Sequence, residues 1–245
     1  MPRTARKESR TGMYHVMLRG INQQLIFEDD EDNEKFLEIL KDCKDASGFK
    51  LFAYCLMGNH VHLLIKIADE GLEQIFKKIG IKYVYWYNWK YNRTGHLFQD
   101  RFKSEPVDSD EYFFTVLRYI HQNPVKAQLV GSVDAYKWSS YKEYLGDKGI
   151  ADVSFALDAM KLNEFVRFNN EANNDTCLEN ISPRINDRDA KEIMKQLINC
   201  DTVEAFQRLD APMKTEGIKR LKGEGLSIRQ ISRLTGISKG IVERA

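Results

Sequence analysis

The alternation of apolar and polar positions divides the first half of the chain into strands and amphipathic helices. Apolar residues recur at helical spacing in two stretches, 29–47 and 72–91. The first helix opens with acidic residues, which suit the positive end of a helix, and Gly48 ends it. Four runs have the composition of strands: 14–19, 49–57, 60–64 and 97–107.

The order of these elements predicts the fold class. Strand–helix–strand–strand–helix–strand is the ferredoxin-like arrangement, a four-stranded antiparallel sheet with two helices on one face. Gly58 and Asn59 form a tight turn signal that makes a hairpin of the second and third strands. We therefore expect an α+β domain over residues 12–146, closed by the aromatic-rich segment 136–145.

A further helix is predicted over residues 111–122, after the capping sequence Asp108-Ser109-Asp110. Pro124 disfavours helical geometry at Asn123, so we expect the helix to end there. Tyr119 and Asn123 are four residues apart, which places them on one face of this helix.

The remainder of the chain has a different character. Residues 1–11 are basic and predict a flexible start, and residues 147–182, rich in Asn, Asp and Ala, predict a helical linker with a loop. Residues 183–245 predict a small all-α domain with thirteen Lys and Arg against nine Asp and Glu. Its end has a capping box at Ser227-Ile228-Arg229-Gln230 and the spacing of a helix-turn-helix in Ser232, Gly236 and Val242; the alternative is a plain helical bundle.

Composition adds little to this picture. The 245 residues contain 37 Lys and Arg against 36 Asp and Glu, so the net charge gives no general argument for nucleic-acid binding. The four cysteines lack metal-ligand spacing and are expected to be reduced thiols. No apolar run approaches the roughly 20 residues of a membrane span. We expect a cytoplasmic, nucleoid-associated protein.

Candidate chemistry centres on His60-Val61-His62. In a strand the two histidines share one face, where they can bind a divalent cation, Mg²⁺ or Mn²⁺; the alternative is a pair of ordinary half-buried histidines. The phenolic oxygen of Tyr119 can form a covalent phosphotyrosine, so these three residues suit DNA strand transfer. The aromatic run 83–91 is interpreted mainly as core packing, although some of its rings could stack on unpaired bases.

Three segments together carry a family resemblance: Leu56-Met57-Gly58-Asn59-His60-Val61-His62-Leu63-Leu64, Arg118-Tyr119-Ile120-His121-Gln122-Asn123-Pro124-Val125-Lys126-Ala127 and Trp138-Ser139-Ser140-Tyr141. They resemble the HUH transposases with a single catalytic tyrosine, and among these the REP-associated tyrosine transposases. The resemblance covers about residues 12–146. The helical domain at the end is outside the family pattern.

The resemblance implies metal-dependent cleavage of single-stranded, hairpin-bearing DNA through a 5′-phosphotyrosine. It implies that His60 and His62 are metal ligands, that Asn123 is a third ligand and that Tyr119 is the nucleophile. The sequence leaves open whether the protein is a monomer or a homodimer. The competing hypothesis is a sequence-specific DNA-binding regulator that retains the transposase scaffold.

Candidate phosphate contacts are basic residues in both predicted domains, with solvation at the surface as the alternative. They are Arg19, Arg101, Lys103 and Lys126, and in the helical domain Arg229, Arg233 and Lys239. His15 and His121 are interpreted as structural or local hydrogen-bonding groups. Tyr112 is interpreted as a packing residue, with a second nucleophile as the alternative.

Overall fold

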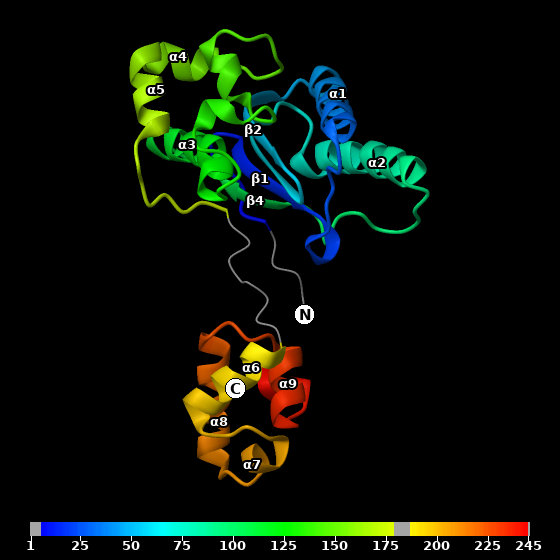
Figure 1. The fold of residues 1–245 in the computed structure, drawn as a ribbon, viewed down its shortest axis with the longest axis vertical. Coiled ribbons are helices and arrows are strands. Elements are labelled where there is room, and N and C mark those ends of the chain that lie inside the picture. Colours follow the sequence, from blue (N-terminus) through cyan, green and yellow to red (C-terminus); the bar gives the residue numbers. More distant parts are fainter. Residues whose placement is uncertain (1–5, 179–186, 245) are drawn as a thin grey trace. The chain divides into compact units, whose positions relative to one another are not determined.

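The computed structural model describes residues 6–178 and 187–244. Two compact units form the chain, Met1–Leu178 and Glu179–Ala245, and each is described by itself (Figure 1). Residues 1–5 of the predicted flexible start lie outside the described residues. Arg6 and Ser9, in contrast, are held by Glu73 and Asp108, so the described part of this segment is fixed to the domain.

The first unit contains a four-stranded antiparallel sheet with the order β2-β3-β1-β4, which confirms the predicted fold. Its strands are β1 (Met13–Arg19), β2 (Lys50–Met57), β3 (His60–Lys66) and β4 (Lys103–Pro106). Its helices are α1 (Asp30–Ser47), α2 (Leu72–Lys90), α3 (Asp110–Lys126), α4 (Ser154–Ala159) and α5 (Leu162–Asn170), with 3-10 turns at Ile21–Gln23, Val133–Ala135 and Ser140–Leu145. The predicted strand 97–107 is shortened to β4, because residues 97–102 keep only an isolated bridge between Phe98 and Gly20.

Helices cover both faces of the sheet (Figure 1). As predicted, α1 and α2 lie on one face, over a core that includes Val61 and Leu63. The sequence prediction left the other face uncovered, but α3 packs there against β2, with Phe113 and Leu117 in a second core. The domain therefore has three layers.

Helix α3 continues through Pro124 to Lys126, so the predicted end at Asn123 is wrong. A proline removes a single backbone donor. The next bonds still form, since Ala127 N–H donates to the Asn123 carbonyl at 2.9 Å and Leu129 N–H to that of Pro124 at 2.9 Å. Burial of Pro124 against the domain accompanies the extra turn.

The sequence predicted that residues 147–178 belong to a linker, but they are part of the first unit. Phe165 of α5 is fully buried and stacks on Tyr144, with ring centroids 4.6 Å apart. The amide of Asn169 bonds to His121 of α3 at 3.0 Å. Residues 169–175 have few apolar side chains and contact α3 mainly through hydrogen bonds and an ion pair. The hydrophobic pattern of the sequence therefore did not predict that this segment packs on the domain. Residues 179–182 of the predicted linker lie outside the described part of the chain.

The second unit is all-helical. It contains α6 (Asp187–Ile198), α7 (Val203–Gln207), α8 (Ala211–Gly223), α9 (Ile228–Thr235) and α10 (Lys239–Arg244). A turn at Gly236 joins α9 to α10, and its φ of +69° is a conformation that favours glycine. A Cβ there would also lie 2.8 Å from the Val203 side chain. Val242 of α10 is fully buried, as the helix-turn-helix spacing requires.

Candidate active site

The polar residues of the first unit gather on the sheet face beneath α3. Antiparallel register places Arg19 opposite His60, and His15 opposite Glu105. Because strand side chains alternate, one face collects every second residue of β1, β3 and β4. The polar side chains among them include His15, Arg19, His60, His62, Lys103 and Glu105.

A hydrogen-bonded chain orients His62. Its Nδ1 lies 2.9 Å from His15 Nε2, and His15 Nδ1 lies 2.8 Å from Glu105 Oε1. Burial opposes ionisation of Glu105, but the bonds from His15 and from the Leu178 amide still lower its pKa. With neutral rings, an ionised Glu105 requires His15 to donate from Nδ1 and to accept from His62 Nδ1. Nε2 of His62 is then left with its lone pair.

His60 is held in a similar way. Its Nδ1 lies 2.6 Å from Asn59 Oδ1, and its side chain also bonds to that of Asn123. The rings of His60 and His62 are nearly perpendicular, with centroids 5.0 Å apart. Burial, with the nearby Arg19 charge, lowers the pKa of His60 to about 4. Burial, together with His15, places the pKa of His62 well below its ordinary value. Both rings are neutral at pH 7, as metal ligation requires.

Helix α3 brings Tyr119 and Asn123 to these histidines, as their spacing of four residues predicts. The Tyr119 ring lies 5.6 Å from the His62 ring and 5.8 Å from the His15 ring, edge-on to both. Lys126, on the next turn, has its Nζ 5.2 Å from the Tyr119 centroid. An aromatic hydroxyl, two imidazoles, an amide and a cation thus share one site.

The donor set fits a hard or borderline divalent ion. Among the described residues, no group of three or more His, Cys, Asp and Glu side chains is arranged as a metal centre, so a site here needs the Asn123 amide. His60 and His62 each have one ring nitrogen fixed by a polar neighbour, which is the usual support of a metal-binding imidazole. Two imidazoles and an amide oxygen, completed by water, suit Mn²⁺ or Mg²⁺.

Residues 9–123 match the family described as transposase IS200-like. The first unit belongs to this family. No curated protein matches the chain.

The IS200-like fold also appears in solved structures. A REP-associated tyrosine transposase bound to a REP hairpin superposes with a TM-score of 0.55 at 14% identity, covering 73% of this chain and 96% of that one. At this identity the likeness shows the fold alone. A protein from Deinococcus radiodurans R1, described provisionally as a transposase, is 18% identical, with 49% and 96% coverage; its TM-score of 0.36 carries no argument.

Segment 171–178 is bonded both to α3 and to β4 in this transposase domain. Asp175 pairs with Arg118 at 2.8 Å, and its carbonyl accepts from Lys126 Nζ at 3.0 Å. The Leu178 amide donates to Glu105, the carboxylate that orients His15. Tyr119 is only 2% exposed. The Tyr119 side chain is therefore covered by the surrounding residues in this structure.

The predicted phosphate contacts separate into three groups. Arg19, Lys103 and Lys126 lie at the site, and Nε of Arg19 is buried without a hydrogen-bond partner among the described residues. Arg101 lies elsewhere, at a cleft beside α2, and pairs with Glu73 at 3.2 Å. The three residues predicted in the helical domain are in the second unit, where Arg233 pairs with Asp187.

Two site residues escaped the sequence prediction. Glu105 carried no signal, because its partner His15 is 90 positions away and only the sheet register joins them. His15 was interpreted as a local hydrogen-bonding group, and it is one, but its partner is the metal-ligand candidate His62. Tyr112 also contacts Glu105, and burial raises its pKa, which agrees with a packing role. No helix in residues 6–178 and 187–244 has the length and apolarity to cross a membrane.

Proposed function

We propose that the transposase domain is a metal-dependent endonuclease and strand-transferase that cleaves single-stranded DNA through Tyr119. The observation that carries this proposal is the contact of the Tyr119 ring with His62, inside a site that also contains His60 and Asn123. A scaffold retained only for DNA binding has no need of this combination. Hairpin-bearing DNA is the proposed substrate, since a relative of the same fold is bound to a REP hairpin.

In the proposed reaction the Tyr119 hydroxyl oxygen attacks the phosphorus of one phosphodiester and loses its proton. The bond between phosphorus and the 3′ oxygen breaks, and that oxygen takes up a proton to become a free 3′-OH. The 5′ end remains attached as a phosphotyrosine, which conserves the bond energy. Attack by another 3′-OH reverses these steps and restores Tyr119, which joins the strands without an external energy source.

The surrounding residues position the phosphate and the nucleophile. His60, His62 and Asn123 would hold Mg²⁺ or Mn²⁺, which supplies a Lewis acid for the scissile phosphate. Arg19 and Lys103 offer positive charge on the sheet, and the unpartnered Nε of Arg19 suits a phosphate oxygen. Lys126, with its Nζ 5.2 Å from the Tyr119 ring centroid, adds positive charge beside the nucleophile.

The test is a covalent protein–DNA band on a denaturing gel, formed with a hairpin-bearing oligonucleotide and Mn²⁺. Tyr119→Phe should abolish the band completely and change the free energy of unfolding by about 1 kcal/mol or less, because one hydroxyl is removed. Tyr112→Phe is the matched control on the same helix and should still form the adduct. If the adduct is lost in Tyr112→Phe but persists in Tyr119→Phe, the nucleophile is Tyr112 and the assignment to Tyr119 is wrong. DNA binding without any adduct would favour the regulator hypothesis.

For the second unit we propose DNA binding through Arg229, Arg233 and Lys239. Arg229 and Lys239 are exposed. The left-handed Gly236 after α9 and the buried Val242 of α10 support a helix-turn-helix as the DNA-binding element of this proposal. Neutralising these three cations in the full chain should make DNA affinity less sensitive to salt, because each lost phosphate contact lowers the logarithmic slope by about 0.9. An unchanged slope would exclude these residues as phosphate contacts.

A further inference from the structure

Helix α2 presents an aromatic stripe to solvent. Ile81, Tyr85 and Trp89 follow one another at intervals of four residues and are 61%, 78% and 74% exposed. They alternate with Tyr83 and Tyr87, which are buried in the core as the sequence predicted. Among the described residues, Tyr85 and Trp89 are the only tyrosine, tryptophan or phenylalanine side chains this exposed, and neither makes a hydrogen bond or ring contact there.

Positive charge accompanies this stripe. Lys77 continues the same row toward the start of the helix, and Lys78 and Lys82 form the adjacent row. Lys77 has no ion pair among the described residues, and Lys82 is 3.9 Å from Asp42, the outer limit of an ion pair. Lys78, in contrast, pairs with Glu70 at 2.6 Å. The one acidic residue of α2, Glu73, is already engaged by Arg6 and Arg101. The exposed face is therefore basic and aromatic.

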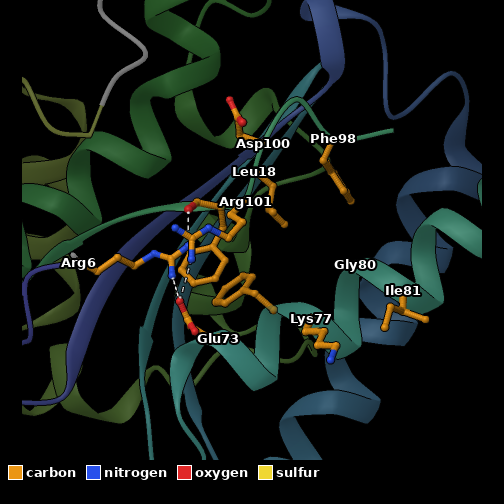
Figure 2. A pocket seen from close by; sticks show the side chains of 11 residues that line it. Arg6, Leu18, Glu73, Lys77, Gly80, Ile81, Phe98, Asp100 and Arg101 are labelled. Carbon is orange, nitrogen blue, oxygen red and sulfur yellow. Dashed lines mark hydrogen bonds and ion pairs between the residues drawn. The ribbon is translucent and has the colours of Figure 1, made fainter. Parts of the chain in front are cut away.

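A cleft of about 380 Å³ adjoins the stripe where Lys77, Gly80 and Ile81 form one wall (Figure 2). Phe76, Phe98 and Phe102 contribute apolar lining. Arg6 lies over the Phe102 ring at 3.9 Å and joins Glu73 at the opposite side of the cleft (Figure 2). Apolar walls with a charged rim are typical of a site for a small flat group.

The cleft lies at the β4 edge of the sheet. Strand β4 is outermost, and the loop 97–102 that forms part of the cleft leads directly into it. Arg101 lies in this loop on the α2 side, and Lys103, two residues later, belongs to the face of the candidate active site. Cations thus occur on both sides of one edge, around which a flexible polyanion can pass.

We propose that the exposed face of α2 and its cleft bind single-stranded DNA, separately from the candidate active site. Unpaired bases would stack on Tyr85 and Trp89, one base would enter the cleft, and Lys77 and Lys82 would contact phosphates. Stacking on exposed rings between lysines is the usual mode of sequence-tolerant single-strand binding. A second copy of the chain is disfavoured as the occupant, because two such basic faces would repel each other.

The inference extends the proposed function to a second contact region for the same substrate, and binding measurements test it without requiring cleavage. An oligo-dT strand of about 20 nucleotides should bind the full chain, and Trp89→Ala or Tyr85→Ala should each weaken binding about 5- to 150-fold. Trp89→Phe, which keeps a ring, should retain most of the affinity. Leu162→Ala is the matched control, since it removes an apolar side chain that is 44% exposed on α5.

The lysines are tested by salt dependence. Lys77→Gln and Lys82→Gln should each reduce the slope of log affinity against log salt by about 0.7, the value for one single-strand phosphate contact. Unchanged slopes in both variants would exclude these lysines from the site.

Because the second unit is also proposed to contact DNA, crosslinking must locate the strand. Ultraviolet crosslinking of bromodeoxyuridine-substituted oligo-dT, followed by trypsin, should modify peptide Tyr83–Lys90, which contains both exposed rings. Unchanged affinity in the Tyr85→Ala/Trp89→Ala double variant, or crosslinks confined to other peptides, would overturn the proposal. So would self-association or binding to anionic vesicles that depends on Trp89 while oligo-dT binding does not.

The two proposals can fail independently. If Tyr119 forms no adduct but Trp89→Ala weakens oligo-dT binding, the proposed catalysis fails and the α2 site stands. If the adduct forms while the double variant binds oligo-dT normally, the α2 site fails alone.

Discussion

The two faces of the sheet differ in chemistry although the same strands build both. On β3, Val61, Leu63 and Ile65 are fully buried beneath α1 and α2 in a core of aliphatic and aromatic side chains. On the opposite face, His62 is also nearly fully buried, but it lies among polar groups beneath α3. Similar burial therefore serves stability on one face and chemistry on the other.

The polar face is tolerated because its hydrogen-bonding capacity is used. Glu105, His15 and His62 form a continuous chain, and Asn59 and Asn123 bond to His60. A buried polar group without a partner would cost about 1–3 kcal/mol. The exception at the site is Nε of Arg19, which has no such partner within residues 6–178 and 187–244. The comparison predicts that substitutions on the sheet face covered by α1 and α2 lower the free energy of unfolding. Substitutions at the polar site beneath α3 should mainly lower activity.

The largest effect should come from removing the segment that completes the α3 face. A fragment of residues 1–147 lacks Phe165 and the Asn169 bond to His121, so we expect it to lose cooperative unfolding, whereas residues 1–178 should fold. Thermal unfolding followed by circular dichroism distinguishes them. The matched point variant Phe165→Ala should cost about 3–5 kcal/mol. Cooperative unfolding of fragment 1–147 would show that α4 and α5 are not needed for the domain to fold.

Next, a pair of variants on β3 separates the two faces. Leu63→Ala should cost about 2–5 kcal/mol in the free energy of unfolding, because it leaves a cavity in the core. His60→Ala should abolish the covalent adduct while unfolding remains cooperative, because His60 is only partly buried. Urea denaturation and the adduct gel measure the two properties. Loss of cooperative unfolding in His60→Ala would instead indicate a structural histidine.

A third effect concerns His121, whose pKa burial lowers to about 4. Below its ordinary pKa of 6.5 the unfolded chain binds a proton that the folded chain excludes, so stability falls as pH drops from about 6.5 to 4. The difference in pKa corresponds to about 3 kcal/mol for this residue alone. His121→Gln should flatten the fall in stability over this range, measured by urea denaturation at several pH values. Part of the fall in stability should remain in this variant, because His60 and His62 also have lowered pKa values in the folded protein.

The smallest predicted effect is on the support of the polar site. His15→Gln breaks the link from Glu105 to His62 and should lower Mn²⁺ affinity or adduct formation about 10- to 100-fold, the usual cost of losing such a partner. Calorimetric titration with Mn²⁺ gives a readout that a purely structural role would not change. Equal Mn²⁺ affinity in the variant and the parent protein would show that His15 does not orient His62.

The sequence alone determined the local elements and their order. Alternation in residues 60–64 divides Val61 and Leu63 from the histidines, and the spacing of four places Tyr119 with Asn123 on one side of α3. These are short-range properties, since the period of a strand or helix acts over a few residues. The motifs in residues 56–64 and 118–127 were therefore enough to predict the family and to name His60, His62, Tyr119 and Asn123 as candidate site residues, but not His15 or Glu105.

Only the tertiary structure decided which distant residues meet. The sheet register brings Glu105 to His15, the fold joins residues 147–178 to α3, and packing carries α3 past Pro124. It also divides the aromatic run of α2 into buried Tyr83 and Tyr87 and exposed Tyr85 and Trp89. Contacts between residues far apart in sequence depend on the packing of the whole domain, which a pattern of a few neighbouring residues cannot predict.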